Sequence, residues 1–251
     1  MSTILLAFPL FLWQRFHGST DWAILLLLPL AWMLFSGSRK PLLATLQARS
    51  LLESQPCSPA SVFSTGKVKA TAFSLLFVVV TVPILALQAL SAGPWTLLTM
   101  LILCVTSSAF VIWTSSWLTH YWKEPFATSR GIFLGSGLSA VLFFPLLLVL
   151  DSTLHSNECR SADFWLWEWF RFINPFRSVP EGGWVTGILE PLFLIECTKR
   201  KLTEMIGEVA VPVQILYSLS FATVTFIVAR AAAATTCFVQ ELTRSRQVDR
   251  N

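Results

Sequence analysis

The sequence predicts an all-α, polytopic integral membrane protein, and three observations support this fold class. No charged residue occurs between Lys69 and Lys123. Charged residues make up only 13% of the 251-residue chain, half of the roughly 25% found in soluble domains. Apolar residues make up 54%, and the mean hydropathy is +0.65. Long apolar runs must satisfy their backbone groups internally in lipid, so these runs predict membrane-spanning helices, about five in all.

The first apolar stretch, residues 4–13, is only about ten residues long, against the roughly 20 that a span needs. It lacks the basic start and the small-residue cleavage site of a signal peptide. We expect an interfacial or half-spanning helix, or the first half of a short hairpin with the next segment. Residues 22–36 follow, with an aromatic residue at each end, and they are the first predicted span.

Residues 37–69 form a polar connection with an excess of positive charge. The positive-inside rule places this connection in the cytoplasm. Its leucines form a loosely helical apolar face, which predicts that part of it lies on the membrane surface. The single acid is Glu53, and the bases are Arg39, Lys40, Arg49, Lys67 and Lys69.

The next two spans, residues 70–90 and 95–118, are predicted to form a hairpin. The turn between them contains Gly93 and Pro94, residues typical of tight turns, and it falls on the outer side. The loop over 119–130 then returns to the inside, where its two bases against one acid agree with the positive-inside rule.

The fourth predicted span, residues 131–150, begins with several small residues, among them Gly135 and Gly137. Small residues allow transmembrane helices to approach closely. We therefore expect Gly135 and Gly137 to lie in a helix–helix interface.

Residues 151–208 differ in character, with nine acids and six bases, and they are predicted to lie outside. An aromatic block contains Trp167 and Trp169, which we expect in the headgroup region. A shorter apolar stretch, residues 184–195, is interrupted by Glu190 and Pro191. We expect this stretch to be an interfacial or re-entrant helix.

The fifth predicted span covers residues 209–230, which places the arginine-rich C-terminal tail in the cytoplasm. If residues 184–195 also crossed, the tail would lie outside. We prefer five spans because Glu190 beside Pro191 makes a poor transmembrane segment. The expected location is the plasma (inner) membrane.

Two ionisable residues in apolar surroundings are candidate functional residues. Arg230 either marks the cytoplasmic end of the last span or is buried in hydrocarbon, where such residues usually have a function. Glu190 either faces water from an interfacial helix or forms an ion or proton site on a broken helix. The first reading is favoured in both cases.

The remaining chemistry is sparse. The five cysteines contain no Cys-x-x-Cys pair, and three scattered histidines offer no metal-ligand spacing. We therefore predict no catalytic residues, metal or cofactor. We also predict no nucleic-acid binding, because the bases lie in short connections. Ser139 is expected to serve helix packing, and Cys159 and Cys197, both outside, to form a disulfide.

The leading functional hypothesis is a non-enzymatic subunit of a larger membrane complex that scaffolds, anchors or gates a partner. Its partners would be membrane lipids and other integral membrane subunits. The alternative is an ion channel or small-solute transporter that uses Arg230 and Glu190. A membrane-embedded lipid-modifying enzyme is the third hypothesis, resting on a loose group of Asp151, His155 and Glu158.

Overall fold

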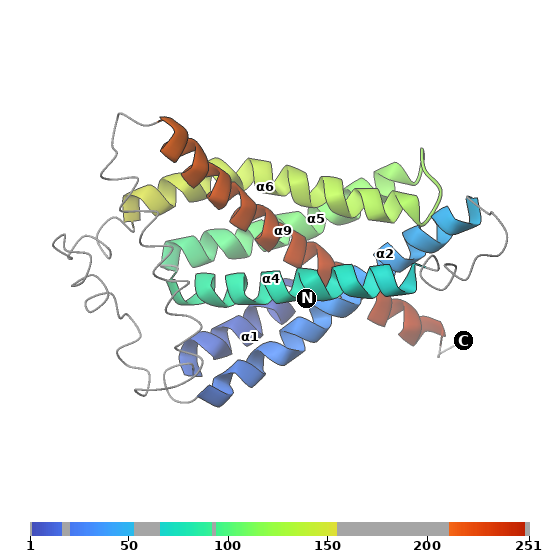
Figure 1. The fold of residues 1–251 in the computed structure, drawn as a ribbon, viewed down its shortest axis with the longest axis horizontal. Coiled ribbons are helices and arrows are strands. Elements are labelled where there is room, and N and C mark those ends of the chain that lie inside the picture. The colour runs from blue at the N-terminus through green and yellow to red at the C-terminus, as the bar shows by residue number, and fades with distance from the viewer. Residues whose placement is uncertain (1, 17–20, 53–65, 92–93, 155–210, 249–251) are drawn as a thin grey trace.

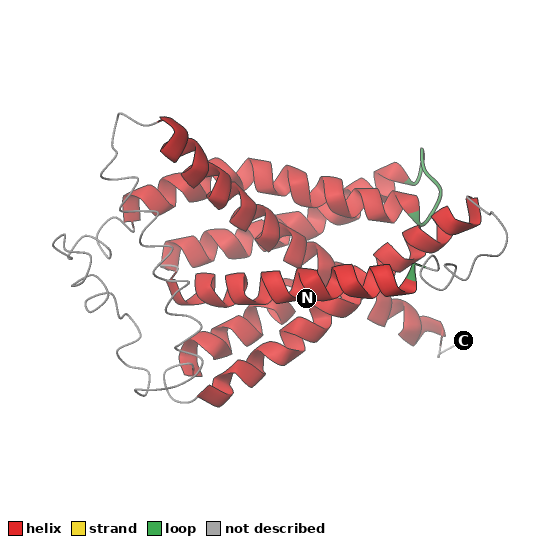
Figure 2. Ribbon diagram, viewed as in Figure 1, coloured by secondary structure: helices red, strands yellow, loops and turns green. Residues whose placement is uncertain are grey.

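A computed structural model describes five stretches of the chain, and every regular element in them is a helix (Figures 1 and 2). The described residues are 2–16, 21–52, 66–91, 94–154 and 211–248. The elements are α1 (Ser2–Phe16), η1 (Asp21–Leu27), α2 (Leu28–Leu52), α4 (Lys67–Ser91), α5 (Pro94–Leu118), α6 (Phe126–Leu154) and α9 (Val211–Val248).

Five of the described helical segments are long and apolar enough to cross a membrane, which confirms the predicted fold class. Such helices satisfy their own backbone hydrogen bonds, as a hydrocarbon solvent requires. The five segments are Asp21–Ala48, Lys67–Leu90, Trp95–Leu118, Phe126–Val149 and Ser218–Thr243.

Bulky apolar side chains cover the outside of the bundle, while small and hydroxyl-bearing residues lie inside. On α6, Val141 and Leu142 are 75% and 60% exposed. Ser136 and Ser139 on the same helix are fully buried, and each hydroxyl donates to the carbonyl four residues earlier. This distribution suits a lipid surround, because helices in membranes associate through small residues rather than through apolar burial.

Helices α5 and α6 have the most extensive contact of the described helix pairs, and glycine makes this contact possible. A Cβ atom on Gly135 would lie 2.7 Å from the backbone of Val111. Next to this contact, Thr114 Oγ1 on α5 donates a 2.8 Å hydrogen bond to the carbonyl of Gly131 on α6. The expected role of Gly135 in close helix packing agrees with its position.

Helix α9 crosses the bundle diagonally and packs on several other helices (Figure 1). Ala229 and the run Ala231–Ala234 are all buried. A Cβ atom on Gly37 of α2 would overlap the carbonyl oxygen of Ala234. The small residues of α9 therefore let α2 approach at backbone distance.

Helix α1 is short and lies against the bundle as the first arm of a hairpin with η1 and α2. Its 15 residues give a length of about 22 Å at 1.5 Å per residue, less than the hydrocarbon core. Ser2 lies beside Ser108, midway along α5, with their hydroxyl oxygens 3.4 Å apart. Trp13 is buried, and its indole N–H donates to the carbonyl of Ala86 on α4.

The end of α2, the start of α4, the loop between α5 and α6 and the end of α9 lie at the same end of the bundle (Figure 1). This basic end carries an ion pair between Lys40 and Glu241. Arg130 stacks there over the Trp122 ring at 3.9 Å. The described bases of this end are Arg39, Lys40, Arg49, Lys67, Lys69, Lys123, Arg130, Arg244 and Arg246.

Two helices extend beyond the predicted spans. Helix α2 continues from the predicted span into the expected connection 37–69 and ends at Leu52. The candidate span Ser218–Thr243 extends past the predicted end at residue 230. In both cases the chain stays helical past the first charged residue. Of the expected outside segment 151–208, the structure describes only the last turn of α6.

Candidate functional site

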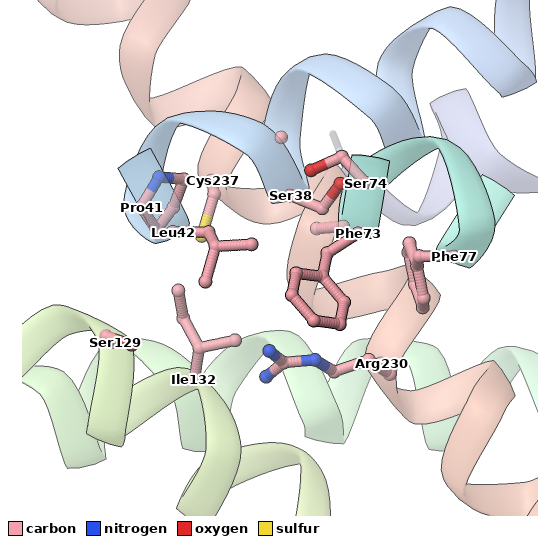
Figure 3. Close-up of a pocket in the computed structure, with 12 residues that line it drawn as sticks. Ser38, Pro41, Leu42, Phe73, Ser74, Phe77, Ser129, Ile132, Arg230 and Cys237 are labelled. Atoms are coloured by element: carbon pink, nitrogen blue, oxygen red, sulfur yellow. The ribbon is translucent and has the colours of Figure 1, made fainter. Parts of the chain in front are cut away.

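Arg230 lies inside the last spanning segment and not at its end. The segment continues to Thr243, thirteen residues further (230 to 243). The Arg230 side chain extends from α9 toward Ile132, close to the start of α6 (Figure 3). The stretch that is long and apolar enough to span therefore includes Arg230, and the interpretation of Arg230 as an end marker stays an untested prediction.

The Arg230 side chain lines a cavity of about 330 Å³ between α2, α4, α6 and α9, called the arginine cavity below. Among its described lining residues, Arg230 alone carries a charge. The lining residues are Gly37, Ser38, Pro41, Leu42, Phe73, Ser74, Phe77, Ser129, Ile132, Arg230, Ala234 and Cys237.

The residues around Arg230 fix the rotation of α9. Ala229 and Ala231 are both 0% exposed. Ser107 of α5 donates a 2.8 Å hydrogen bond to the Ala229 carbonyl. Because this face of α9 is held against α5, the side chain of Arg230 is directed to the cavity.

Two buried polar atoms of the cavity have no hydrogen-bond partner among the described residues. They are Nη1 of Arg230 and Oγ of Ser74. The buried Ser136 and Ser139, by contrast, donate to carbonyls of their own helix. A buried donor without a partner has a free-energy cost of about 1–3 kcal/mol, and more when it is charged. The cavity thus offers donors that a ligand can use.

No described carboxylate balances the charge of Arg230 in this cavity. Glu241, further along α9, pairs with Lys40. Both carboxylate oxygens of Glu124 accept from the Thr128 hydroxyl. An intramembrane cation usually pairs with an acid or a carbonyl, or faces a polar cavity. For Arg230 the described structure gives the polar cavity.

A second feature is a larger groove of about 850 Å³ between α1, α4, α5 and α9, called the α1 groove below. Most of it is apolar, but several of its lining residues are small or polar. These are Ser2, Thr3, Ala7, Gln14, Gln88, Ala89, Cys104 and Ser108. At one end, Thr236 of α9 donates to Ser108, whose oxygen lies beside that of Ser2. No sequence pattern pointed to this groove, because its walls come from helices far apart in the chain.

The two glycines that were predicted to lie in a helix–helix interface, Gly135 and Gly137, have different surroundings. Gly135 lies against Val111, whereas nothing lies within 4 Å of a Cβ atom built on Gly137 among the described residues. The expected packing role of Gly137 therefore finds no partner helix in the described chain. Ser139 donates to the Gly135 carbonyl, in keeping with its expected packing role.

Several other candidates fall outside the described residues. These are Glu190, Trp167, Trp169, His155 and Glu158, and also the predicted Cys159–Cys197 disulfide. Within the described stretches, no group of three or more His, Cys, Asp or Glu side chains is placed to hold a metal ion. The ring of His120 contacts only carbonyls of its own helix end, those of Ser116 and Trp117.

Comparison with known proteins adds no functional assignment. The chain matches no family model, and no curated protein or solved structure resembles it significantly. The functional argument therefore rests on the arginine cavity and the α1 groove.

Proposed function

We propose that this chain is a non-enzymatic subunit of a larger membrane complex that scaffolds, anchors or gates its partner. The observation that carries the proposal is the α1 groove, a wide indentation of about 850 Å³ in the membrane-facing part of the bundle. Its proposed occupant is a transmembrane helix of another integral subunit.

The composition of the α1 groove favours a helix over lipid tails. Transmembrane helices associate through small residues and hydroxyl groups, which allow backbone approach and interhelical hydrogen bonds. The groove presents such residues as Ala7, Ala89 and Ser108. Bulky residues such as Phe8 and Leu101 line the rest of the groove and would pack against the side chains of a partner helix.

The short length of α1 creates this indentation. Helix α1 begins beside Ser108, midway along α5, so it covers only part of the face formed by α4 and α5. A partner helix would complete the layer that α1 begins. Its contact would combine van der Waals packing with polar contacts to residues such as Gln88.

Site-specific photocrosslinking in native membranes tests this proposal. Val105 and Ile102 are both exposed residues of α5, but only Val105 lines the α1 groove. A photoreactive amino acid at Val105 should give one defined protein adduct, and the same probe at Ile102 should give none. The crosslinked protein should also copurify in stoichiometric amount from mild detergent. Adducts only to a second copy of this chain, or equal crosslinking at both positions, would contradict the proposal.

We also propose a plasma (inner) membrane location with the C-terminus in the cytoplasm, and the distribution of charge supports this orientation. Bases such as Lys67, Lys69 and Lys123 gather at the end of the bundle where α9 ends (Figure 1). The positive-inside rule assigns such an end to the cytoplasm. A C-terminal reporter that is active only in the cytoplasm should be active, and a reporter that is active only outside should not be.

A channel or small-solute transporter is the second candidate, because Arg230 lines a cavity inside the membrane-spanning segment. The other residue of that hypothesis, Glu190, lies outside the described residues. Liposome flux assays with small anions test it. A transporter should show flux that Arg230→Gln abolishes while the thermal midpoint is kept. An absence of flux in the unaltered protein would reject this candidate.

A further inference from the structure

The arginine cavity has a charge that the described chain leaves without a counter-charge. Arg230 is its only charged lining residue, and Nη1 is buried without a hydrogen-bond partner among the described residues. The nearest acid along α9, Glu241, pairs with Lys40. Burying a guanidinium in a low-dielectric region is costly without an anion or polar partners. The geometry therefore calls for an anionic ligand.

The cavity has a polar side and an apolar side. Hydroxyl groups of Ser74 and Ser129 accompany Arg230, and the Ser74 Oγ is buried without a partner. Phe73 and Phe77 of α4 supply aromatic surface. The volume of about 330 Å³ is several times the roughly 30 Å³ that one water molecule occupies. The cavity thus has room for an anionic group together with an apolar attachment.

The guanidinium points toward the basic end of the bundle. Figure 3 shows the side chain extending from α9 to Ile132, one and a half turns from the start of α6 at Phe126. Long basic side chains in membranes extend in this way toward the headgroup region. Ser74 lies seven residues from Lys67, a depth of about 10 Å at 1.5 Å per residue. A headgroup phosphate that enters between the helices would meet the side chain part-way.

The ligand chemistry follows from the guanidinium and its surroundings. An arginine offers a planar fork of donors that matches phosphate oxygens. Exposed bases at the same end, such as Lys69 and Lys123, attract anionic lipids to this surface. Basic pockets between transmembrane helices on the cytoplasmic side are known to take anionic headgroups. A free inorganic anion would have no apolar part to place against Phe73 and Phe77.

We propose that the arginine cavity binds the phosphate group of an anionic phospholipid. Arg230 donates hydrogen bonds to the phosphate oxygens. Phe73 and Phe77 contact the glycerol and the first part of an acyl chain. This binding site is separate from the α1 groove, with which it shares no lining residue.

Native mass spectrometry of the delipidated full-length protein, titrated with phosphatidylglycerol or phosphatidylcholine, tests the proposal. Phosphatidylglycerol should bind more tightly and raise the thermal midpoint. Arg230→Gln should weaken its binding about tenfold, the loss expected for a charge-assisted hydrogen bond. The matched control is Lys67→Gln, which removes one exposed charge at the same end outside the cavity. It should change the affinity by less than about twofold.

Three results would overturn the proposal. Equal binding of the two lipids by the unaltered protein would exclude an anion-selective site, and this comparison needs no variant. Equal losses in Arg230→Gln and Lys67→Gln would indicate general surface attraction. Displacement of the lipid by inorganic phosphate, with Arg230-dependent binding of phosphate alone, would indicate a site for a soluble anion. If Arg230→Gln does not fold, Arg230→Lys keeps the charge but loses the fork and should bind the lipid about threefold more weakly.

Discussion

The hydroxyl of Ser107 on α5 donates a 2.8 Å hydrogen bond to the carbonyl oxygen of Ala229 on α9. Both residues are 0% exposed. The bonded carbonyl directly precedes Arg230 in the chain, so the contact that holds α9 on α5 also sets the direction of the arginine side chain. One face of α9 therefore packs in the core, and an adjacent face lines the arginine cavity.

This hydrogen bond should contribute measurably to stability. Ser107→Ala removes the donor, and interhelical hydrogen bonds in membranes contribute about 0.6–1.7 kcal/mol to the free energy of unfolding. We expect a loss in this range in detergent unfolding experiments. Ser116→Ala, an exposed serine on the same helix, is the control and should change the free energy by less than about 0.5 kcal/mol. Equal effects of the two substitutions would show that the Ser107 bond has no special role.

Two glycines on α6 should respond in opposite directions to the same substitution. In Gly135→Ala the added methyl meets the Val111 backbone at 2.7 Å, and such overpacking costs about 1–3 kcal/mol. In Gly137→Ala the methyl meets nothing within 4 Å among the described residues, and alanine favours a helix over glycine by up to about 1 kcal/mol. Thermal unfolding of both variants measures the difference. A destabilised Gly137→Ala protein would place a further segment or a partner against this position.

The fold class was predictable because a span requires a long apolar run, and such runs are visible in any sequence. The ends of the helices were less predictable. The expected end of the first span at residue 36 followed from the charges of Arg39 and Lys40, yet α2 continues to Leu52. Just beyond the predicted end, Gly37 lies against the backbone at Ala234. That contact joins segments about 200 residues apart, and no local pattern reveals it.

The candidate site was only partly predictable. Arg230 could be selected from the sequence because it is a charge in an apolar region. Its depth could not be predicted, because it depends on how the residues after it, such as Ala231–Ala234, are buried in the bundle. Ser74 and Phe73 line the same cavity as Arg230 only because α4 has a particular rotation in the bundle. Hydroxyl residues in apolar spans are frequent and usually bond to their own helix. The unpartnered Ser74 hydroxyl therefore had no distinguishing signal in the sequence.

The contact of α2 with α9 should depend on packing more than on charge. Gly37→Ala places a methyl on the Ala234 carbonyl and should lower the free energy of unfolding by about 1–3 kcal/mol. Lys40→Gln breaks the ion pair with Glu241, whose side chains are 59% and 42% exposed. An exposed pair contributes about 0–1 kcal/mol and is screened by salt. Unfolding measured at low and at high salt separates the contribution of helix packing from that of the ion pair. A larger loss in Lys40→Gln that persists at high salt would reverse this order.

The attachment of α1 should depend on Trp13. Its side chain is 1% exposed, and the indole N–H donates a 3.3 Å hydrogen bond to the Ala86 carbonyl on α4. Trp13→Phe keeps an aromatic ring but removes the donor, so we expect a loss of about 0.5–1.5 kcal/mol in the free energy of unfolding. Trp32→Phe is the matched control, because Trp32 on α2 is 64% exposed, and it should be nearly neutral.

A second readout connects Trp13 to the α1 groove. Helix α1 supplies one wall of that groove, so loosening α1 should also weaken partner crosslinking from Val105. Because the loss at Trp13 is small compared with the total stability of a folded domain, the protein should remain folded while crosslinking falls. Unchanged crosslinking in a destabilised Trp13→Phe protein would show that the partner contacts α5 without α1. The occupied surface would then be the open face of α5, and the short helix would serve stability alone.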